Sequence, residues 1–497
     1  MNFRYLNYLF CTSLIVLTFS CKKNLEILPS DAIVADRAIT SVADLEQAMI
    51  GVYGSMGNTN VQYRTAGNAD IIISSLMSDE NYLPAENASG IGVNMYKWQI
   101  SQDDQNAWAN WGSSLVVTNP VTYTGSNYAV IDRVNRVLRV IDDIPATTND
   151  EIVKKTRFRG ELFALRAFCH FRVLKSYAEN YEPQSLGVPY MESINDAPGK
   201  VKPSRLTVGE TFAKIERDLE ESKKYISNYG EVTRLSLNAV NALRARVFLF
   251  EKQWDKAAAA ATEVINTVAL ATRAEFPGIW SDANSAEVIW KLKKDTDNDK
   301  IGLFYKPSST VVEYAASLKL INSFNQADDI RFSTYIKIDN TRGAGKTPYL
   351  VNKYAHNATT AGLADIKLFR VAEMYLIRAE AYAESNTIAN NFALASADLN
   401  TLRNARIQNY VPVTYSTKQE LIDAVYWERF KELAFEGHRY FDLRRRNLAI
   451  DRNPIAPDDA GGTNSVRITS TERGYYLPIP GFEIRANENM VQNPLYK

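Results

Sequence analysis

The chain has 497 residues, of which 45% are apolar and 23% charged, a composition that is typical of a globular protein and excludes a disordered or fibrous one. Lysine plus arginine and aspartate plus glutamate balance at 57 each, so no overall basic field argues for binding nucleic acid. A chain of this length can bury a large core without disulfides, and its length allows about three domains.

The first twenty residues predict a signal peptide. Arg4 is the only charge before Lys22, and Leu6–Phe19 is a mostly apolar run. That run is shorter than the roughly 20 residues that a membrane-spanning helix needs, and it ends in a small residue followed by Cys21. We therefore predict a lipoprotein signal over residues 1–20 with lipidation of Cys21. The alternative is an ordinary secretory signal with an incidental cysteine after it.

Cysteine usage agrees with a lipid anchor. Cys11 would leave with the signal, and Cys169 lies in a helical apolar run where it is expected to be a buried small hydrophobe. With Cys21 carrying acyl chains such as palmitate, no disulfide is predicted. The mature protein would then be anchored to a membrane and not threaded through it.

Apolar residues recur at helical spacing along most of the chain. The predicted helices are, in chain order, Ser41–Met56, Tyr128–Ile144, Asp150–Tyr181, one that opens at Thr207, Leu237–Glu251, Asp255–Val268, Asp365–Ser385, Ala389–Ile407 and Thr417–Phe435. Thr207 with Glu210 three residues later has the form of a capping box. These segments predict a mainly α protein with a helical scaffold mainly over residues 36–57, 127–270 and 365–450.

Helices that follow one another in pairs suggest a repeat. Ala245, Phe248 and Ala257 suit the small, aromatic and small positions of a tetratricopeptide repeat over residues 241–264, and residues 374–402 match more loosely. One such pair cannot bury its apolar face alone, so the pairs are expected to stack on each other. The alternative is a set of unrelated helical hairpins.

Two regions interrupt the helical pattern, at about 59–126 and 271–364. The first is rich in Asn, Ser, Gly and aromatic residues, and the second contains short strand-like runs such as Val288–Leu292 and Phe332–Ile338. Long excursions between rigid elements commonly carry binding residues. We therefore expect these two insertions to hold the ligand.

The N-terminal and C-terminal parts of the chain each carry several short motifs. The C-terminal motifs are Trp427-Glu428-Arg429, Glu432-Leu433, Glu436-Gly437-His438-Arg439, Asp442-Leu443-Arg444, Tyr476-Leu477-Pro478-Ile479-Pro480, Glu483-Ile484, Asn487 and Gln492-Asn493-Pro494. The N-terminal ones are Cys21-Lys22-Lys23, Leu25-Glu26, Pro29, Gly51-Val52-Tyr53, and Tyr128 with Ile131 and Asn135. Together they resemble the SusD/RagB family of outer-membrane nutrient-binding lipoproteins over nearly the whole mature chain, with Leu495 in place of a common Gly.

This resemblance implies a single domain over residues 21–497 with the SusD-like fold. That fold is mainly α, with about four tetratricopeptide-like helix pairs and loop-rich insertions that contain short strands. The resemblance also implies a lipoprotein on the outside of an outer membrane, where it would cover a SusC-like TonB-dependent barrel. The usual cargo of the family is a glycan, and some relatives take peptides.

Aromatic rings stack on the flat C–H faces of sugars, while amides and carboxylates orient the hydroxyls. Three of the seven tryptophans lie within 14 residues of the first insertion, interleaved with polar side chains. The predicted ligand-binding residues are Trp98, Trp108, Trp111, Tyr82, Tyr96, Asp104, Asn106 and, in the second insertion, Trp280. The alternative is that some of these rings are core anchors, Trp111 first among them because it precedes a scaffold helix.

Other conspicuous residues are interpreted as structural. Trp254 lies in a repeat turn and Trp427 on a motif helix, and both are expected to pack against neighbours. The charges at Glu436, Arg439, Asp442 and Arg444 are spaced by two to three residues, so we expect them to pair with each other on a helix.

Motifs of catalysis and of metal binding are missing from the sequence. None of His170, His356 and His438 has a His or Cys at metal-ligand spacing, and there is no GxSxG elbow. Gly343–Thr347 ends like a phosphate-binding loop but lacks its first glycine. We predict no enzyme, no cofactor and no metal site, although a structural calcium ion could not be read from the sequence. Glycan binding for import is the first hypothesis; binding of peptides or another nutrient, and an enzyme or structural adaptor, are the alternatives.

Overall fold

The structure is a computed structural model, and it describes residues 38–57, 67–87, 90–112, 115, 126–194, 201–295, 300–306, 311–355, 360–462 and 465–497. The predicted signal peptide and Cys21 lie outside these residues. No helix in the described ranges combines the length and the apolar character that crossing a bilayer requires.

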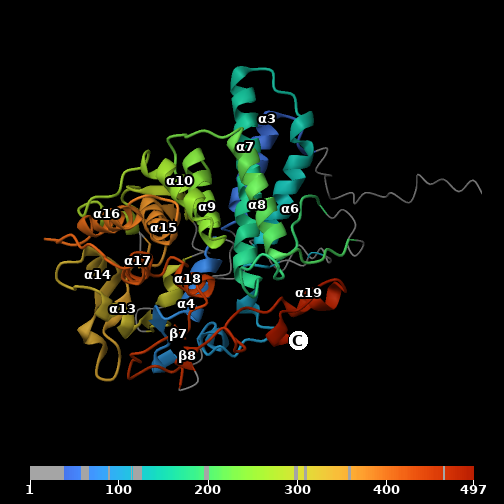
Figure 1. Ribbon diagram of the computed structural model, residues 1–497. Helices are drawn as coiled ribbons and strands as arrows, with labels where there is room; N and C mark the ends of the chain where they lie inside the picture. Colours follow the sequence, from blue (N-terminus) through green and yellow to red (C-terminus); the bar gives the residue numbers. More distant parts are fainter. Residues whose placement is uncertain are drawn as a thin grey trace, which may run out of the picture.

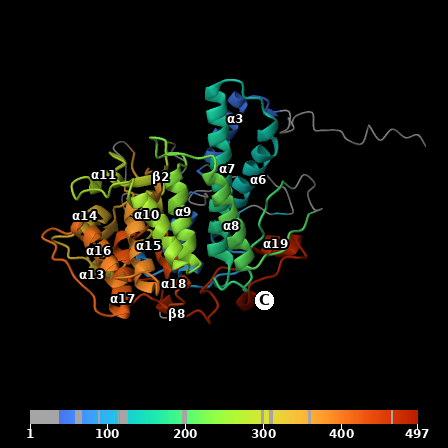
Figure 2. The ribbon, with the colours of Figure 1, turned by 45° about the horizontal axis from the view of Figure 1, so that its top comes forward.

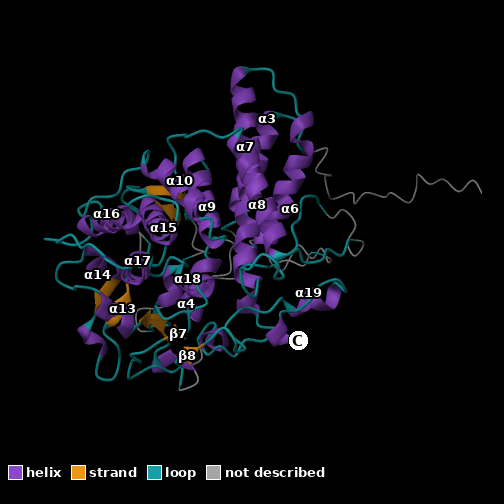
Figure 3. Ribbon diagram, in the orientation of Figure 1, coloured by secondary structure: helices purple, strands orange, loops and turns teal. Residues whose placement is uncertain are grey.

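The protein is mainly α, as predicted (Figure 3). Its longer helices are α3 (Val42–Gly54), α6 (Asn127–Val140), α7 (Asn149–Tyr177), α8 (Val208–Lys223), α9 (Leu237–Phe250), α10 (Trp254–Ile265), α15 (Val371–Glu384), α16 (Asn391–Asn404) and α17 (Lys418–Glu432). The shorter ones are α4 (Ala69–Met77), α5 (Val93–Tyr96), α11 (Phe276–Trp280), α12 (Gly302–Tyr305), α13 (Leu318–Ser323), α14 (Ile330–Tyr335), α18 (Arg439–Arg445) and α19 (Gly481–Ala486).

Consecutive helices pack side by side. α6 lies against α7, α7 against α8, α9 against α10, and α15 against α10, α16 and α17. Figures 1 and 2 show α3, α6, α7 and α8 as one upright group, with α9, α10 and α15 to α17 beside it. Ala245, Phe248 and Ala257, on the paired helices α9 and α10, are all buried. The predicted stacking of helix pairs is therefore confirmed.

Local sequence signals set the starts of several helices. Ser41, Thr148, Thr207 and Thr417 each accept a hydrogen bond from the backbone three residues on, and the acidic side chain there bonds back to the cap. These are capping boxes, which satisfy two otherwise unpaired backbone donors at once. The one predicted at Thr207 is confirmed.

The strands form two-stranded antiparallel sheets. They are β1 (Asn81–Tyr82) with β3 (Ala315–Ala316), β2 (Val288–Leu292) with β6 (Ile366–Arg370), β4 (Ile336–Ile338) with β5 (Tyr349–Val351), and β7 (Ile450–Asp451) with β8 (Arg467–Ile468). In the longest pair, Val288 lies opposite Arg370 and Leu292 opposite Ile366.

Two sequence predictions need correction, and one helix is missed. The helix expected from Asp365 begins only at Val371, because residues 366–370 pair with β2 as a strand. The strand expected over Phe332–Ile338 is a short helix up to Tyr335 followed by β4. Helix α4 was not predicted, because its apolar residues show no helical periodicity when nearly every side chain of the helix is buried.

Buried ion pairs join the last helices to the insertion. Glu432 of α17 is fully buried and accepts hydrogen bonds from Arg331 of α14, Arg370 of β6 and Arg406, at 2.9–3.1 Å for the shortest contact of each. The nearby Glu428 holds Arg331 at 2.6 Å. A buried carboxylate needs partners of this kind, since an unpaired one would not stay charged.

The pairing fixes the charge state of this carboxyl group. Burial acts to raise the pKa of Glu432, but the guanidinium groups of Arg406, Arg370 and Arg331 outweigh burial and lower that pKa to about 2. Glu432 is therefore ionised at neutral pH.

We expect the Glu432→Gln variant to be destabilised by about 3–5 kcal/mol, because it leaves buried guanidinium groups without their countercharge. Urea unfolding at pH 7 measures this loss. The matched control is Glu488→Gln, which removes an exposed carboxylate from its 3.2 Å pair with Lys202 and should change stability by less than about 1 kcal/mol. Equal losses in the two variants would contradict the structural role of Glu432.

Acid should weaken the fold through the same group. The unfolded pKa of a glutamate is about 4.3, above the folded value of about 2 for Glu432. The stability from this shift is therefore present above about pH 4.3 and is lost as the pH falls towards 2. Chemical unfolding at several pH values checks this, and stability that is constant between pH 5 and pH 2.5 would contradict it.

Candidate ligand-binding site

The predicted tryptophan platform is part of the core. Trp98, Trp108 and Trp111 are 5%, 8% and 0% exposed. The indole N–H of Trp98 donates to the Met77 carbonyl at 3.2 Å, and that of Trp108 donates to the Gln102 carbonyl at 2.9 Å. Their faces are covered, so the expectation of an open stacking surface is wrong for all three, and the core-anchor alternative fits them.

Trp111 shows the packing most clearly. Its ring meets Tyr128 and Tyr177 edge-on, with ring centroids 5.1 and 5.3 Å apart. The Trp111 backbone N–H also donates to the Tyr177 hydroxyl at 2.9 Å. The residue therefore ties the first insertion to α7, which is the anchoring role that its position before a scaffold helix indicates.

The tyrosines of the predicted site are buried as well. Tyr82 and Tyr96 are 3% and 0% exposed, and their hydroxyls donate to Asp458 and Asp459 at 2.9 Å. The Arg452 guanidinium lies 3.9 Å from the centroid of the Tyr96 ring. Both rings therefore join the insertion to the C-terminal segment and present no free face.

The polar candidates and Trp280 have local structural partners. Asp104 caps the short 3₁₀ helix η3 (Gln105–Trp108) by accepting from the Asn106 N–H at 2.9 Å, and both side chains are half-buried. Trp280 is 3% exposed, with the Lys353 ammonium 4.0 Å from its ring centroid. The structure does not bring Trp280 together with the tryptophans of the first insertion into one surface.

The charged motif residues are structural, but they mostly pair with other elements. Glu436 binds Lys353 and Arg370, both at 2.6 Å, and Arg439 binds Asp79 at 2.7 Å. The expectation that these side chains pair with each other along one helix is therefore wrong in its partners. Linear spacing could not reveal contacts between residues so far apart in the chain.

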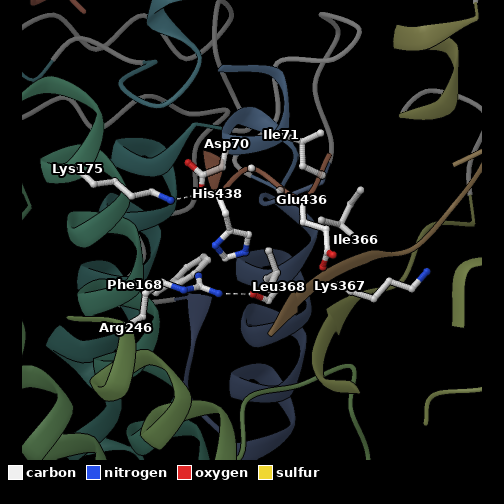
Figure 4. A pocket seen from close by; sticks show the side chains of 12 residues that line it. Asp70, Ile71, Phe168, Lys175, Arg246, Ile366, Lys367, Leu368, Glu436 and His438 are labelled. Carbon is white, nitrogen blue, oxygen red and sulfur yellow. Dashed lines mark hydrogen bonds and ion pairs between the residues drawn. The ribbon is translucent and has the colours of Figure 1, made fainter. Parts of the chain in front are cut away.

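A small charged cavity lies behind this segment (Figure 4). Asp70, Lys175, Glu436 and His438 line it, and its volume of about 20 Å³ has room for about one water molecule and none for a sugar. Burial acts to raise the pKa of Asp70, but Arg172 and Lys175 lower it to about 2. The cavity belongs to the paired core and is not a binding site for cargo.

A pocket of about 620 Å³ opens where several helices end. Its size falls in the usual range for small-molecule sites. The lining residues are Glu179, Asn180, Tyr181, Glu182, Leu249, Lys252, Trp254, Glu384, Arg444, Arg445, Arg446, Asn447, Ser470 and Tyr475. None of them is among the residues that the sequence predicts to touch ligand. For Trp254, the sequence predicts packing against its neighbours.

The turn between α9 and α10 brings Trp254 to the pocket. The Gln253 N–H donates to the Phe248 carbonyl at 2.9 Å and the Lys252 N–H to the Leu249 carbonyl at 3.3 Å, which is the Schellman arrangement. It requires Lys252 to adopt a positive φ, here 59°. The chain then reverses at once, and Trp254 starts α10 half-buried at the pocket wall.

The end of α18 repeats this arrangement on another wall of the pocket. The Leu448 N–H donates to the Leu443 carbonyl and the Asn447 N–H to the Arg444 carbonyl, both at 2.9 Å. Asn447 has a φ of 53°, which asparagine tolerates better than most residues. Its amide side chain is exposed at the pocket.

The two tyrosines of the pocket lining are held by hydrogen bonds to backbone carbonyls. The Tyr181 hydroxyl donates to the Lys175 carbonyl at 2.6 Å and the Tyr475 hydroxyl to the Leu448 carbonyl at 2.7 Å. Both rings are nearly buried. The pocket thus combines one half-buried indole with the amides of Asn180 and Asn447 and with carboxylates, the set of groups that suits a polyhydroxylated ring.

The Arg444 guanidinium binds the carbonyls at the C-terminal end of α7. It donates to the carbonyls of Lys175 at 2.8 Å and Glu179 at 3.1 Å, and also to that of Ala178. A cation at a helix C-terminus satisfies its free carbonyls and complements the helix dipole. Its charge is therefore committed to α7.

A second, shallower groove of about 770 Å³ runs between α10 and the α15–α16 connection. The Asp255 carboxylate in its lining already has partners, because it accepts from Ser385 at 2.7 Å and from Thr387 at 2.5 Å. Alanines of α10 and the exposed Leu394 make up much of its surface. Fewer hydrogen-bonding side chains line it than line the pocket at Trp254. Within the described ranges, no group of His, Cys, Asp and Glu side chains has the arrangement of a metal site.

Comparison with known proteins identifies the family of the chain. A family profile described as the SusD family matches residues 334–496, and one described as starch-binding, associating with outer membrane, matches residues 61–249. The chain belongs to the SusD-like family. It is 24% identical to SusD-like protein P2 of Formosa agariphila over 530 aligned positions, covering 96% of this chain and 97% of that relative.

Other relatives agree with this assignment. Starch-binding protein SusD of Bacteroides thetaiotaomicron is 38% identical over 133 residues, 27% of this chain and 22% of that protein. A crystal structure of a SusD superfamily protein from the same species has a TM-score of 0.77 at 22% identity and covers 92% of this chain and 100% of that one. A putative sugar binding protein from Bacteroides vulgatus has a TM-score of 0.75 at 22% identity, covering 93% and 100%.

We expect the two classes of tryptophan to differ in stability. Trp111→Ala should lose about 3–5 kcal/mol, because it empties a fully buried site, and Trp254→Ala no more than about half of that. Urea unfolding of both variants measures the difference. A Trp254→Ala variant that loses as much as Trp111→Ala would show that Trp254 is a core residue and not a pocket wall.

Proposed function

We propose that this SusD-like protein is a cell-surface lipoprotein of an outer membrane that binds a glycan and delivers it to a SusC-like TonB-dependent transporter. The observation that carries the proposal is the pocket at Trp254, whose lining combines a half-buried indole with hydrogen-bonding amides and carboxylates. The family description as starch-binding and outer-membrane-associated, and the starch-binding relative, support it.

In this proposal the pocket binds and releases cargo without transforming it. One sugar ring would stack on Trp254, and its hydroxyls would donate to the Glu179 carboxylate and accept from the amides of Asn180 and Asn447. A stacking contact is worth about 0.5–1.5 kcal/mol, by analogy with aromatic pairs. With the hydrogen bonds, that gives affinity in roughly the micromolar to millimolar range, which lets a carrier hand its cargo on.

The sharpest test of the site compares the half-buried Trp254 with the exposed Trp427. Trp254→Ala should weaken glycan binding about three- to tenfold, the loss of one stacking contact. The matched control is Trp427→Ala, because Trp427 is 47% exposed on α17 and lies outside the pocket lining. Calorimetric titration with plant, fungal and host-type polysaccharides, and with mixed peptides, measures both variants.

The outcomes of that titration separate the hypotheses. Loss of affinity in Trp254→Ala alone supports the site, and equal affinity in both variants refutes it. Binding to peptides only would favour the alternative cargo. Chemical analysis of the bound glycan after incubation should return it unchanged, and release of shorter products would show an enzyme.

The membrane anchor is tested through Cys21. The Cys21→Ala variant should move from the membrane fraction to the soluble fraction, because it cannot be lipidated. Membrane fractionation that is unchanged by the substitution would refute the lipid anchor. Co-purification of a TonB-dependent barrel with the wild-type protein tests the proposed transporter partner.

A further inference from the structure

The small cavity beside the start of α18 has more positive than negative charge around it. The charged side chains of its lining are the cations Lys175, Arg246 and Lys367 and the carboxylates Asp70 and Glu436. Figure 4 shows the charged ends of Lys175 and Arg246 next to the ring of His438, which completes the polar lining. Three cations against two carboxylates leave the lining with a net positive charge.

The surplus arises at Asp70, which serves two buried cations. Arg172 donates to one of its oxygens at 2.9 Å and Lys175 to the same oxygen at 2.7 Å. Both cations are less than one-tenth exposed, and among the described residues neither has a second carboxylate within ion-pair distance. The two terminal nitrogens of Arg172 are buried without a hydrogen-bond partner. One buried positive charge therefore lacks a countercharge, which is costly.

The other lining charges do not compensate for it. Arg246 has its own carboxylate, Glu373 at 2.5 Å, and Lys367 has Asp282 at 2.5 Å. Glu436 is itself shared between two further cations. The surplus at Asp70 therefore stays within this part of the core.

The surplus is visible in the titration of Lys175. Burial lowers the pKa of its ammonium group to about 8, although Asp70 acts to raise it. The nearby Arg246 and Arg172 lower that pKa further. An anion in the cavity would counter both effects, because a second negative charge favours the charged form of the lysine.

The cavity also offers hydrogen-bond donors that have no acceptor. Arg246 uses Nε and Nη2 to bind Glu373 and the Leu368 carbonyl, and its Nη1 donates to no described residue. Neither ring nitrogen of His438 is hydrogen-bonded to a described residue, since Nδ1 lies 3.8 Å from Glu373. Burial lowers the pKa of His438 well below its usual value and Arg246 lowers it further, so the ring is neutral with one N–H donor.

The carboxylate oxygens of the lining are already in use as acceptors. The second oxygen of Asp70 accepts from Asn110 at 2.7 Å, and Glu436 accepts from Lys353 and Arg370, both at 2.6 Å. A water molecule would need acceptors for its own two hydrogens. An occupant that only accepts hydrogen bonds and carries negative charge matches this lining better.

The size of the cavity limits that occupant to a single atom. Its volume of about 20 Å³ exceeds the roughly 10–15 Å³ that one water needs. Sulfate, phosphate and carboxylate groups have several heavy atoms and do not fit. We propose that the cavity binds one chloride ion, held by Lys175, Arg246 and the ring N–H of His438. The ion would join α7, α9 and the residue that precedes α18, and this inference does not depend on the glycan function.

Bromide tests the site directly, because it has the same charge as chloride and scatters X-rays anomalously. Crystals of the full-length protein are grown with sodium bromide as the only halide. We expect an anomalous difference peak in the cavity beside His438. A cavity that holds water or is empty, with bromide peaks only at other places, would overturn the proposal.

Thermal unfolding shows whether the ion binds in solution. The full-length protein is unfolded in detergent buffer with sodium chloride or with sodium methanesulfonate, whose anion is too large for the cavity, at equal ionic strength. Chloride should raise the midpoint by about 1–3 °C and the rise should saturate, as expected for a ligand that binds only the folded state. Equal midpoints in the two salts would overturn the proposal and make any bromide in the cavity an adventitious ion only.

A pair of lysine variants assigns the chloride response to the cavity. Lys175→Met removes the cavity cation, while Arg172 and Asn110 keep Asp70 paired, and most of the chloride-dependent shift should be lost. The matched control is Lys202→Met, which removes the same charge from a surface pair with Glu488 and should keep the shift. Equal shifts in the two variants would overturn the assignment. If Lys175→Met does not fold, the bromide experiment on the unsubstituted protein decides.

Discussion

The fold depends on keeping buried carboxylates paired with guanidinium groups. Glu432 is fully buried with three arginines around it, which come from a short helix, a strand and the turn just after α16. None of these charges could be buried alone, because desolvation would exceed what any single contact returns. The network therefore requires the second insertion and the last helices to assemble in one arrangement.

Arg444 acts in the same way from α18, since its guanidinium completes the end of α7. The charged motif of the C-terminal third is thus a set of joints between distant elements.

These joints also place the pocket. Because Arg444 is bound to the end of α7, the loop after α18 lies beside residues 179–182, and the turn after α9 completes the wall. The pocket is therefore a consequence of where helices stop. Two of those stops are Schellman turns, whose residues of positive φ, Lys252 and Asn447, face the open volume. The same geometry sets the chemistry, because amides, carboxylates and basic side chains surround one half-buried indole.

The helices could be predicted from the sequence because their signals are local. Apolar spacing and the capping box at Thr207 need only a few residues, and the family motifs extend the prediction from single helices to their arrangement.

The site could not be predicted, because sequence shows that a tryptophan is near polar residues but not whether its faces are covered. Trp98 and Trp111 look like a platform in the sequence, yet their partners, such as Met77 and Tyr177, come from other segments. Trp254 looked like a packing residue, because the Schellman turn that exposes it depends on Lys252 adopting a conformation in which glycine is the expected residue. The partners of Glu436 and Arg439 were missed for the same reason, since Lys353 and Asp79 are distant in sequence.

The most direct test of the account is a crystal structure of the protein with a neutral oligosaccharide bound. We expect one sugar ring to lie on the indole of Trp254, with hydroxyl groups within hydrogen-bonding distance of Glu179, Asn180 or Asn447. Trp98, Trp108 and Trp111 should stay buried. A sugar bound elsewhere, with the pocket at the helix ends empty, would contradict it.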